Sequence, residues 1–390
     1  MRMNGTVGVR GCRRRRSLVE QHNNQGTRHL QIRNMPRQKR NRRGDTNRGY
    51  KACYSDPSDV SDGTLSELVK YNSDQAEHLT KDALNEFGAV FETCKSVVFL
   101  ASTHDTNPVF SCSGTVVEHV ESETWILTSA TLVRKPGIEH EAYNSDDIKI
   151  KVVLHNKQDV EGCLAMCDLH YNLAIVTIKS PISLPAVKLS DLPECYSMQP
   201  MPVVSVGRDY FSVVLMRCGK LIRLSSELDC DELLVTVCEA SEHFIGGPIV
   251  DMENRILGIT FFNEDDTPFL PVEIAARCLK SFKRNKLLPR LRIRGQAVHT
   301  LGLYALESLC CRYANKVPSG FLVKKVCGLS SESCGGIEVG DVISKLDDVD
   351  LYSVAQFTTM LLDKMEAANG TQNTVTSQMV VDARYEEMVE

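Results

Sequence analysis

Ser241 and His243 are the residues whose types and spacing come closest to nucleophilic chemistry. A serine hydroxyl attacks a carbonyl only when a base takes its proton, and histidine is the usual base. Residues two apart on a strand point to the same face, so this pair could meet. The sequence offers no carboxylate to orient the histidine and no shaped hole for an oxyanion. A hydrolase rebuilt on this pair, on Ser129 or near His170 is therefore not favoured, and we expect both histidines at the surface or in loops.

The 390 residues could form two or three domains, each with its own core. No apolar run approaches the ~20 residues of a membrane span, and no secretory signal opens the chain, so no membrane partner is expected.

The 15 cysteines are scattered, with Cys163/Cys167 and Cys310/Cys311 as the only close pairs. Zinc-ligand spacing is absent, so reduced, mostly buried thiols in a reducing compartment are favoured. We predict no metal and no cofactor.

Charge is divided unevenly along the chain. Residues 1–51 hold 15 of the 45 Lys and Arg but only 2 of the 50 Asp and Glu, a balance of +13, so the rest of the chain holds 30 and 48, a balance of −18. Residues 1–60 lack hydrophobic periodicity, which predicts a disordered basic arm. Its basic clusters, 13–16 and 37–43, fit a nuclear localisation signal that binds an importin, a nucleic-acid-contacting arm, a transit peptide or a plain solvated tail. The location is therefore nuclear or cytoplasmic, or chloroplast or mitochondrion if the arm is a transit peptide.

The residues between the arm and about position 290 change from helical to strand-like character. Helical spacing of apolar residues in 65–91 predicts a helical lead-in over 61–94. Short β-rich runs separated by turn residues follow, and a helix over 272–283 closes the region. Many short strands without intervening helices indicate an antiparallel barrel or sandwich. The runs are 96–101, 110–120, 124–128, 148–154, 173–178, 203–206, 233–237 and 255–262.

Three blocks of the β-rich region read WILTSATLV at 125–133, DLHYNLAIV at 168–176 and HFIGGPIVD at 243–251. In this order they resemble the catalytic motifs of the Deg/HtrA branch of trypsin-like serine proteases. The resemblance implies a double antiparallel β-barrel over 95–288, in which a histidine, an aspartate and a serine would form the catalytic triad. Taken together and in this order within residues 95–288, they predict the fold.

The residues at the triad-equivalent positions cannot perform the triad's chemistry. Thr131 stands where the family has the histidine base, Asn172 where it has the aspartate, and Ile245 where it has the serine nucleophile. A threonine cannot shuttle a proton near neutral pH, and a hydrocarbon cannot attack a carbonyl. His243 replaces the glycine of the family's oxyanion loop, so we expect that loop to sit differently. The sequence thus predicts a trypsin-like fold without catalysis.

Residues 289–390 resemble the circularly permuted PDZ domain of Deg/HtrA proteases, an α/β module. The resemblance rests on the strand SGFLVKKV at 319–326, the turn at Gly340-Asp341 and a helix over 353–364 with Ser353 as its N-cap. PDZ domains bind protein C-termini or extended peptides by strand addition. The residues that would line the peptide site are Leu291, Arg292, Ile293, Val354, Phe357, Thr358 and Leu361. The alternative is that the helical stripe among them faces the domain core.

Three functions follow from these observations. The favoured one is a non-catalytic Deg/HtrA-like adaptor or scaffold that binds polypeptides through its PDZ domain, and it implies homo- or hetero-oligomers with Deg/HtrA-like proteins by resemblance only. The second is a working serine endopeptidase with a non-standard site. The third is a nuclear or nucleic-acid-tethered adaptor that acts through the basic arm.

Overall fold

The structure is a computed structural model with two compact units, residues 36–289 and residues 1–35 with 290–390. It describes residues 26–32, 88, 90–138, 140–179, 184–189, 201–226, 228, 230–238, 240–263, 266–284, 286–288, 293–312, 318–326, 337–369 and 375–384. Within these residues, no helix has both the length and the apolar character needed to cross a bilayer.

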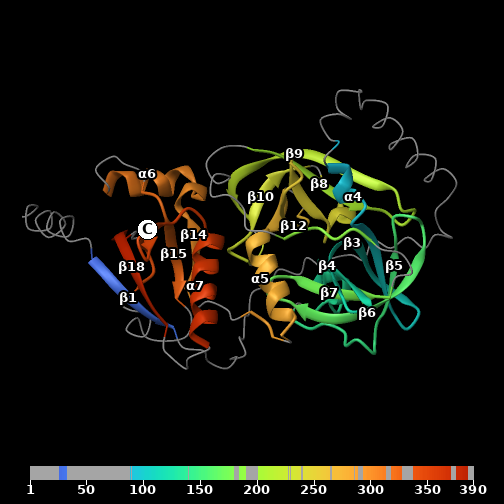
Figure 1. Cartoon of the computed structure of the whole chain (residues 1–390). Coiled ribbons are helices and arrows are strands. Elements are labelled where there is room, and N and C mark those ends of the chain that lie inside the picture. Colours follow the sequence, from blue (N-terminus) through green and yellow to red (C-terminus); the bar gives the residue numbers. More distant parts are fainter. Residues whose placement is uncertain are drawn as a thin grey trace, which may run out of the picture. The chain divides into compact units, whose positions relative to one another are not determined.

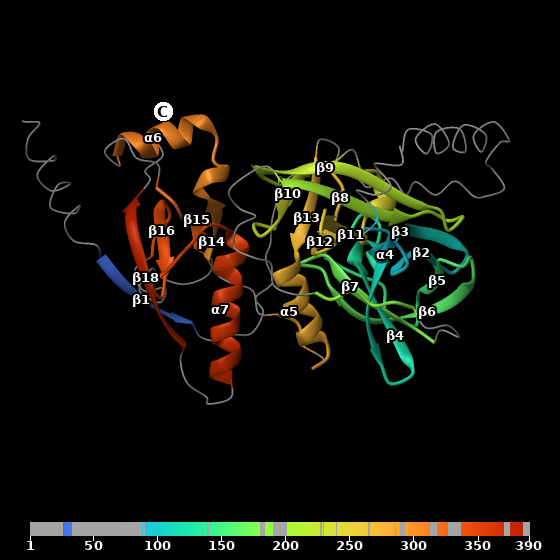
Figure 2. The ribbon, with the colours of Figure 1, turned by 45° about the horizontal axis from the view of Figure 1, so that its top comes forward.

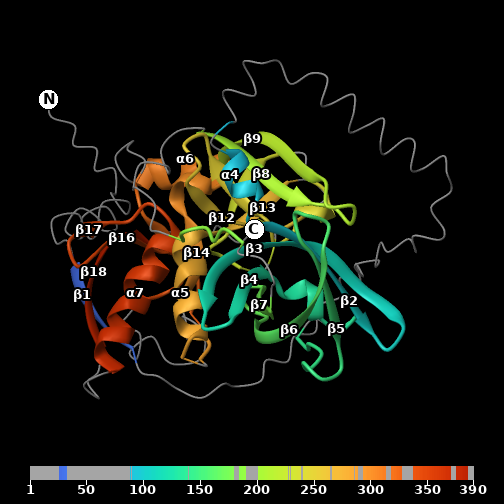
Figure 3. The same cartoon turned by 45° about the vertical axis from the view of Figure 1, so that its right-hand side comes forward.

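Unit 36–289 contains two closed antiparallel barrels of six strands each (Figures 1 and 3). The first runs in the order β2-β3-β4-β7-β6-β5, with strands at Val97–His104, Asn107–Val120, Glu123–Ser129, Leu173–Ile178, Asp159–Asp168 and Lys149–Val153. The second runs in the order β10-β13-β12-β11-β8-β9, with strands at Leu234–Val237, Thr267–Pro271, Ile256–Thr260, Pro248–Asp251, Met201–Arg208 and Val214–Ser225. The predicted trypsin-like double barrel is confirmed.

Two helices flank the second barrel. α4 (Val90–Cys94) packs Val90 and Cys94 into an apolar cluster with the strands β8, β11 and β12. α5 (Val272–Phe282) follows β13 directly and buries one apolar face, as an amphipathic helix should. Of the predicted helical lead-in over 61–94, the structure describes only residue 88 and residues 90–94.

A buried arginine fixes α4 and β2 to the second barrel. Arg208, at the end of β8, is 3 % exposed. Its Nη2 donates to the carbonyl of Cys94 at 2.6 Å, its Nε to that of Val97 at 2.6 Å, and its Nη1 to that of Ser212 at 2.7 Å. These three carbonyls belong to separate segments, so one planar guanidinium joins them at a fixed distance.

The second unit is a small antiparallel sheet with helices. β14 (Ile293–Ala297), β15 (Phe321–Val326), β16 (Asp341–Leu346) and β18 (Val375–Arg384) pair in that order, and β17 (Val349–Asp350) pairs with β16. Side chains alternate between the faces of the sheet, so Phe321 and Ile343 pack with α7 (Val354–Asn369; Figure 2), while Leu322 and Val342 pack with α6 (Leu303–Arg312). Ser353 caps α7 as predicted, because its Oγ accepts the amide of Gln356 at 3.0 Å.

One strand lies in the segment that was expected to be without structure. β1 (Gly26–Ile32) pairs antiparallel with β18, from Gly26 opposite Val381 to Ile32 opposite Val375. These seven residues belong to the arm over 1–60, for which the sequence predicts disorder, and they pair with the sheet through backbone groups, which any sequence carries. The rest of the basic arm lies outside the described residues.

Candidate functional site

The triad-equivalent positions meet where the two barrels adjoin. Thr131 lies in a 3-10 turn (Ala130–Val133) after β4, and Asn172 in the turn before β7. Ile245 follows a second 3-10 turn (Glu242–Phe244), which leads into β11. The carbonyl of Ile245 accepts the amide of Ser113 on β3 at 2.8 Å, which ties this loop to the first barrel.

Thr131 and Asn172 bind each other. The Thr131 Oγ1 lies 3.2 Å from both the Oδ1 and the Nδ2 of Asn172, and the Ser129 hydroxyl donates to the same Oγ1 at 2.9 Å. Arg134 Nη2 donates to Asn172 Oδ1 at 3.1 Å. Asn172 has φ of +52°, a left-handed conformation that asparagine tolerates better than most residues. Three neutral side chains and the Arg134 guanidinium thus hold the two turns together, and none of them can carry a proton away from a nucleophile.

Asp168 positions Asn172 indirectly. Its Oδ1 accepts the amide of His170 at 2.8 Å and that of Tyr171 at 3.4 Å, which closes the turn in front of Asn172. An aspartate whose carboxylate accepts hydrogen bonds from the amides two and three residues ahead is typical of a turn. Asp168 is therefore accounted for by the turn and does not stand in for the missing triad carboxylate.

Ile245 fills the space that a nucleophile would leave open. Its side chain is 5 % exposed and packs with Leu132 and Val133, which directly follow Thr131. Tyr143, Cys167 and Phe262 pack against the same apolar cluster. A branched hydrocarbon at this position thus contributes packing between the barrels, worth about 1.5–3 kcal/mol for a fully buried Ile.

The amide that the mechanism would use for the oxyanion is already engaged. In the trypsin-like mechanism, the amides of the nucleophile and of the residue two before it bind the oxyanion. Here the Ile245 amide donates to the Glu242 carbonyl at 3.1 Å within the 3-10 turn. His243 is exposed and is not among the residues with positive φ. In this turn the Ile245 amide is therefore bonded to a carbonyl oxygen, whereas catalysis needs that amide as a free donor to the oxyanion.

The glycines after Ile245 are retained for the fold. Gly246 has φ of +79°, and a Cβ built there would overlap the Ser113 carbonyl oxygen and approach Thr128 Oγ1 to 2.6 Å. The Gly246 amide donates to Thr260 and the Gly247 amide to Phe244, both at 2.9 Å. Both glycines therefore have a structural role in joining this loop to the two barrels.

Gly246→Ala tests this structural role. We expect it to lower the free energy of unfolding by about 2–4 kcal/mol, because the Cβ adds a steric clash to the cost of positive φ. Gly137→Ala is the matched control, since Gly137 has φ of +74° with no atom near its Cβ, and it should cost about 1 kcal/mol. Urea unfolding followed by the fluorescence of Trp125, the single tryptophan, measures both. Equal losses in the two variants would contradict the role.

Other hydroxyl and thiol groups near the site are occupied or hard to ionise. The buried Ser113 Oγ donates to the His243 carbonyl at 2.6 Å and accepts the Arg208 amide at 2.8 Å. Burial raises the pKa of Cys112 to about 12. Burial, followed by the charge of Asp168, raises the pKa of Cys167 to about 12. A thiol attacks as its thiolate, so neither cysteine is a competent nucleophile near neutral pH.

Ser241 and His243 are both exposed, and no hydrogen bond joins their side chains. Sequence reasoning missed one neighbour: the Asp209 carboxylate, at the β8–β9 hairpin, lies within electrostatic reach of His243. Burial raises the pKa of Asp209 above its ordinary value. Amide hydrogen bonds act in the opposite direction but are the smaller effect, and the one from Val213 is 2.8 Å long. A residue that closes a hairpin could not have been paired with His243 from spacing alone. The carboxylate serves the hairpin, and among the described residues no hydroxyl or thiol group is hydrogen-bonded to the His243 ring.

The residues proposed for peptide binding lie in the second unit. Leu291 and Arg292 lie outside the described residues. Ile293 begins β14, and the four remaining residues lie on α7, where all are buried: Val354, Phe357, Thr358 and Leu361. Ile293, Val354, Phe357 and Leu361 share one apolar cluster, in which Phe357 stacks on Phe321 with ring centroids 4.8 Å apart. These contacts correspond to the alternative interpretation, in which the apolar residues of α7 face the domain core.

Two comparisons with known proteins agree with this geometry. Residues 112–259 match the family model described as trypsin-like peptidase domain, a range that includes Thr131, Asn172 and Ile245. The chain is 25 % identical over 254 residues to the Arabidopsis thaliana protein "Putative protease Do-like 14". That match covers 60 % of this chain and 56 % of the relative, so it spans just over half of the relative's length. Residues 112–259 are therefore similar to a trypsin-like peptidase domain, in agreement with the double-barrel fold, and the chain is similar in sequence to a Do-like protease.

Proposed function

We propose that this protein is a non-catalytic member of the Deg/HtrA-like group that binds polypeptides. The observation that carries the proposal is the state of the three triad-equivalent positions. Thr131 and Asn172 bond to each other, and Ile245 is buried in hydrocarbon. Losing every triad member removes the base, the orienting carboxylate and the nucleophile together, and the engaged Ile245 amide removes a donor for the oxyanion as well.

The second unit is the proposed polypeptide-binding module, of PDZ type. β14 pairs only with β15 among the described strands, so its other edge is a candidate for strand addition. Because the apolar residues of α7 lie in the core, the proposal rests on the backbone edge of β14 rather than on side chains of α7. Arg292, one residue before β14, would hold the C-terminal carboxylate of the ligand.

A peptide library tests this binding directly. The full chain would be screened against decapeptides with free C-termini and against the same peptides with C-terminal amides. We expect enrichment of free C-termini by at least about tenfold, since a charge-assisted hydrogen bond to a carboxylate is lost in the amide. Arg292→Gln should reduce the preference, and Arg284→Gln, an exposed cation on the other unit, is the control.

Two results would count against peptide binding. Equal capture of acids and amides would remove the C-terminal mode, and no enriched sequence at all would remove the peptide-binding function. Neither result would be evidence for catalysis, which is tested separately by labelling of an active serine. The relative's name describes a protease, so hydrolysis is the competing function that such labelling must address.

A further inference from the structure

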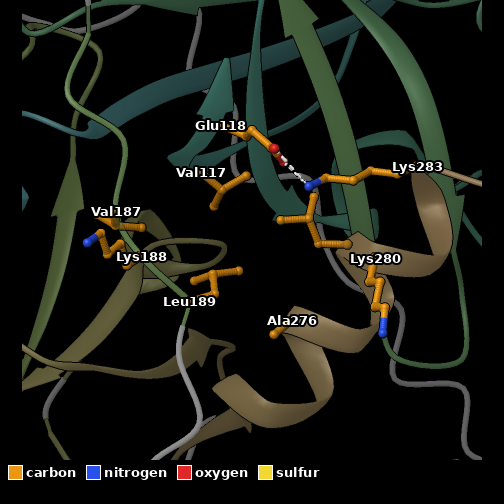
Figure 4. Close-up of a pocket in the computed structure, with 9 residues that line it drawn as sticks. Val117, Glu118, Val187, Lys188, Leu189, Ala276, Lys280 and Lys283 are labelled. Carbon is orange, nitrogen blue, oxygen red and sulfur yellow. Dashed lines mark hydrogen bonds and ion pairs between the residues drawn. The ribbon is translucent and has the colours of Figure 1, made fainter. Parts of the chain in front are cut away.

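A groove lies on the surface of unit 36–289. It is formed by α5, the end of β3 and the segment 184–189 between the barrels, and its volume is about 430 Å³ (Figure 4). The residues that line it are Val117, Glu118, Val187, Lys188, Leu189, Ala276, Leu279, Lys280 and Lys283. None of them belongs to the degenerate site.

The floor of the groove is apolar and held in place. Five of the lining residues have aliphatic side chains: Val117, Val187, Leu189, Ala276 and Leu279. The Val187 amide donates to the Val116 carbonyl at 2.9 Å, and the His119 ring lies 2.7 Å from the Leu184 carbonyl. The segment 184–189 is therefore held to β3 at Leu184 and at Val187. Leu189 also packs against the apolar cluster of the second barrel. The groove is thus formed before any ligand binds.

The rim carries positive charge. Lys188, Lys280 and Lys283 line it together with one carboxylate, Glu118, which lies 2.6 Å from the Lys283 ammonium. The chain beyond residue 51 has a formal charge balance of −18. The groove, with three lysines and one glutamate, has a charge of the opposite sign. Figure 4 shows Lys188 on one side of the floor and Lys280 and Lys283 on the other. A ligand that spans the groove would meet cations at both ends and hydrocarbon between them.

We propose that this groove binds an acidic peptide segment of a partner protein, with an apolar side chain on the floor and carboxylates at the flanking lysines. A small anion would reach the lysines on one side and leave the floor uncovered. Nucleic acid would meet the rim with its phosphates but would bring no aliphatic group to the floor. Charge at the rim steers and orients such a peptide, while the covered floor supplies affinity. This binding is separate from the proposed function of the second unit.

Fluorescence anisotropy with two labelled hexapeptides tests the proposal on the full chain. The probe is Glu-Glu-Leu-Phe-Glu-Glu, and the control is Lys-Lys-Leu-Phe-Lys-Lys. We expect saturable binding of the acidic peptide alone, weakened when salt rises from 50 to 200 mM, because exposed charge pairs are screened. Trp125 lies opposite Glu118 in the β3–β4 pairing, so its fluorescence should change in the same titration.

Variants assign the binding to the groove. Lys188→Glu with Lys280→Glu should weaken it at least about tenfold, whereas Lys149→Glu with Lys157→Glu, an equal charge change at exposed lysines elsewhere on the unit, should not. Glu118→Gln should tighten it about two- to fivefold, since it removes a repelling carboxylate. Ala276→Trp should block binding by size without changing charge, with the thermal unfolding midpoint as a check on folding.

Several results would overturn the proposal. These are equal binding of the two peptides, absence of saturable binding to the wild-type chain, and unchanged binding in both the double lysine variant and Ala276→Trp. Self-association of the chain that rises with concentration and disappears in the double lysine variant would assign the groove to a second copy instead.

Discussion

The triple variant Thr131→His, Asn172→Asp, Ile245→Ser, which restores the residue types of the triad, is expected to cleave peptides at no more than about one hundredth of the rate of a quadruple variant that also carries His243→Gly. The reason is the hydrogen bond from residue 245 to the Glu242 carbonyl, which keeps a donor away from the oxyanion. Removing one oxyanion donor typically costs about 10²–10³ in kcat. Glycine at 243 would let the loop leave the 3-10 turn.

Steady-state hydrolysis of a fluorogenic peptide library measures both variants. The control is the quadruple variant with alanine in place of the restored serine, which separates enzyme turnover from contamination. If the triple variant were as active as the quadruple variant, the loop would not limit catalysis and the account of the oxyanion site would be wrong.

Arg208→Met is expected to lower the free energy of unfolding of the double-barrel unit by about 3–5 kcal/mol. The substitution keeps much of the side-chain volume but leaves the carbonyls of Cys94, Val97 and Ser212 without their donor. Each buried unsatisfied group costs about 1–3 kcal/mol. Total stabilities of about 5–15 kcal/mol are usual, so this variant should lie close to the threshold of folding.

Urea unfolding monitored by Trp125 fluorescence measures the effect of Arg208→Met. Arg208→Lys should fall between the wild type and Arg208→Met, because a lysine ammonium keeps the charge but not the planar fork. Lys149→Met removes one exposed cation and should change stability by less than about 0.5 kcal/mol. A loss for Arg208→Met within that range would show that the buried guanidinium does not hold the segments together.

Much of the double barrel could be predicted from local pattern. The apolar runs at 124–128 and 173–178 correspond to β4 and β7, which are largely or wholly buried, and the helix over 272–283 to α5. β6 escaped prediction because its apolar residues, 163–167, are exposed or half-buried and follow one another without the alternation of a half-buried strand. β1 escaped because its pairing with β18 joins residues more than 340 positions apart, and nothing in its own sequence marks such a partner.

The residue types at the triad-equivalent positions were predictable, but their geometry was not. The residue types at 131, 172 and 245 exclude the triad chemistry without any coordinates. The bond between the first two could not be predicted, because it joins turns 41 residues apart. The packing of Ile245 could not be predicted either, because Leu132 and Val133 lie more than 100 positions earlier in the sequence. The engaged amide of Ile245 likewise follows from a 3-10 turn that His243 only suggested. No sequence pattern predicted the groove beside α5, because Lys280 and Lys283 are typical of the exposed C-terminal end of a helix.

Labelling of the full wild-type chain with a fluorophosphonate probe tests the central claim most directly. The probe forms a covalent bond with a serine that is activated by a base and an oxyanion hole, and intact mass spectrometry counts the adducts. The account predicts no adduct at a probe concentration that labels an active trypsin-like protease completely, because position 245 is a buried isoleucine and the nearby Ser113 and Ser129 hydroxyls are held in hydrogen bonds. Stoichiometric modification of any serine, lost on prior heat denaturation, would contradict it.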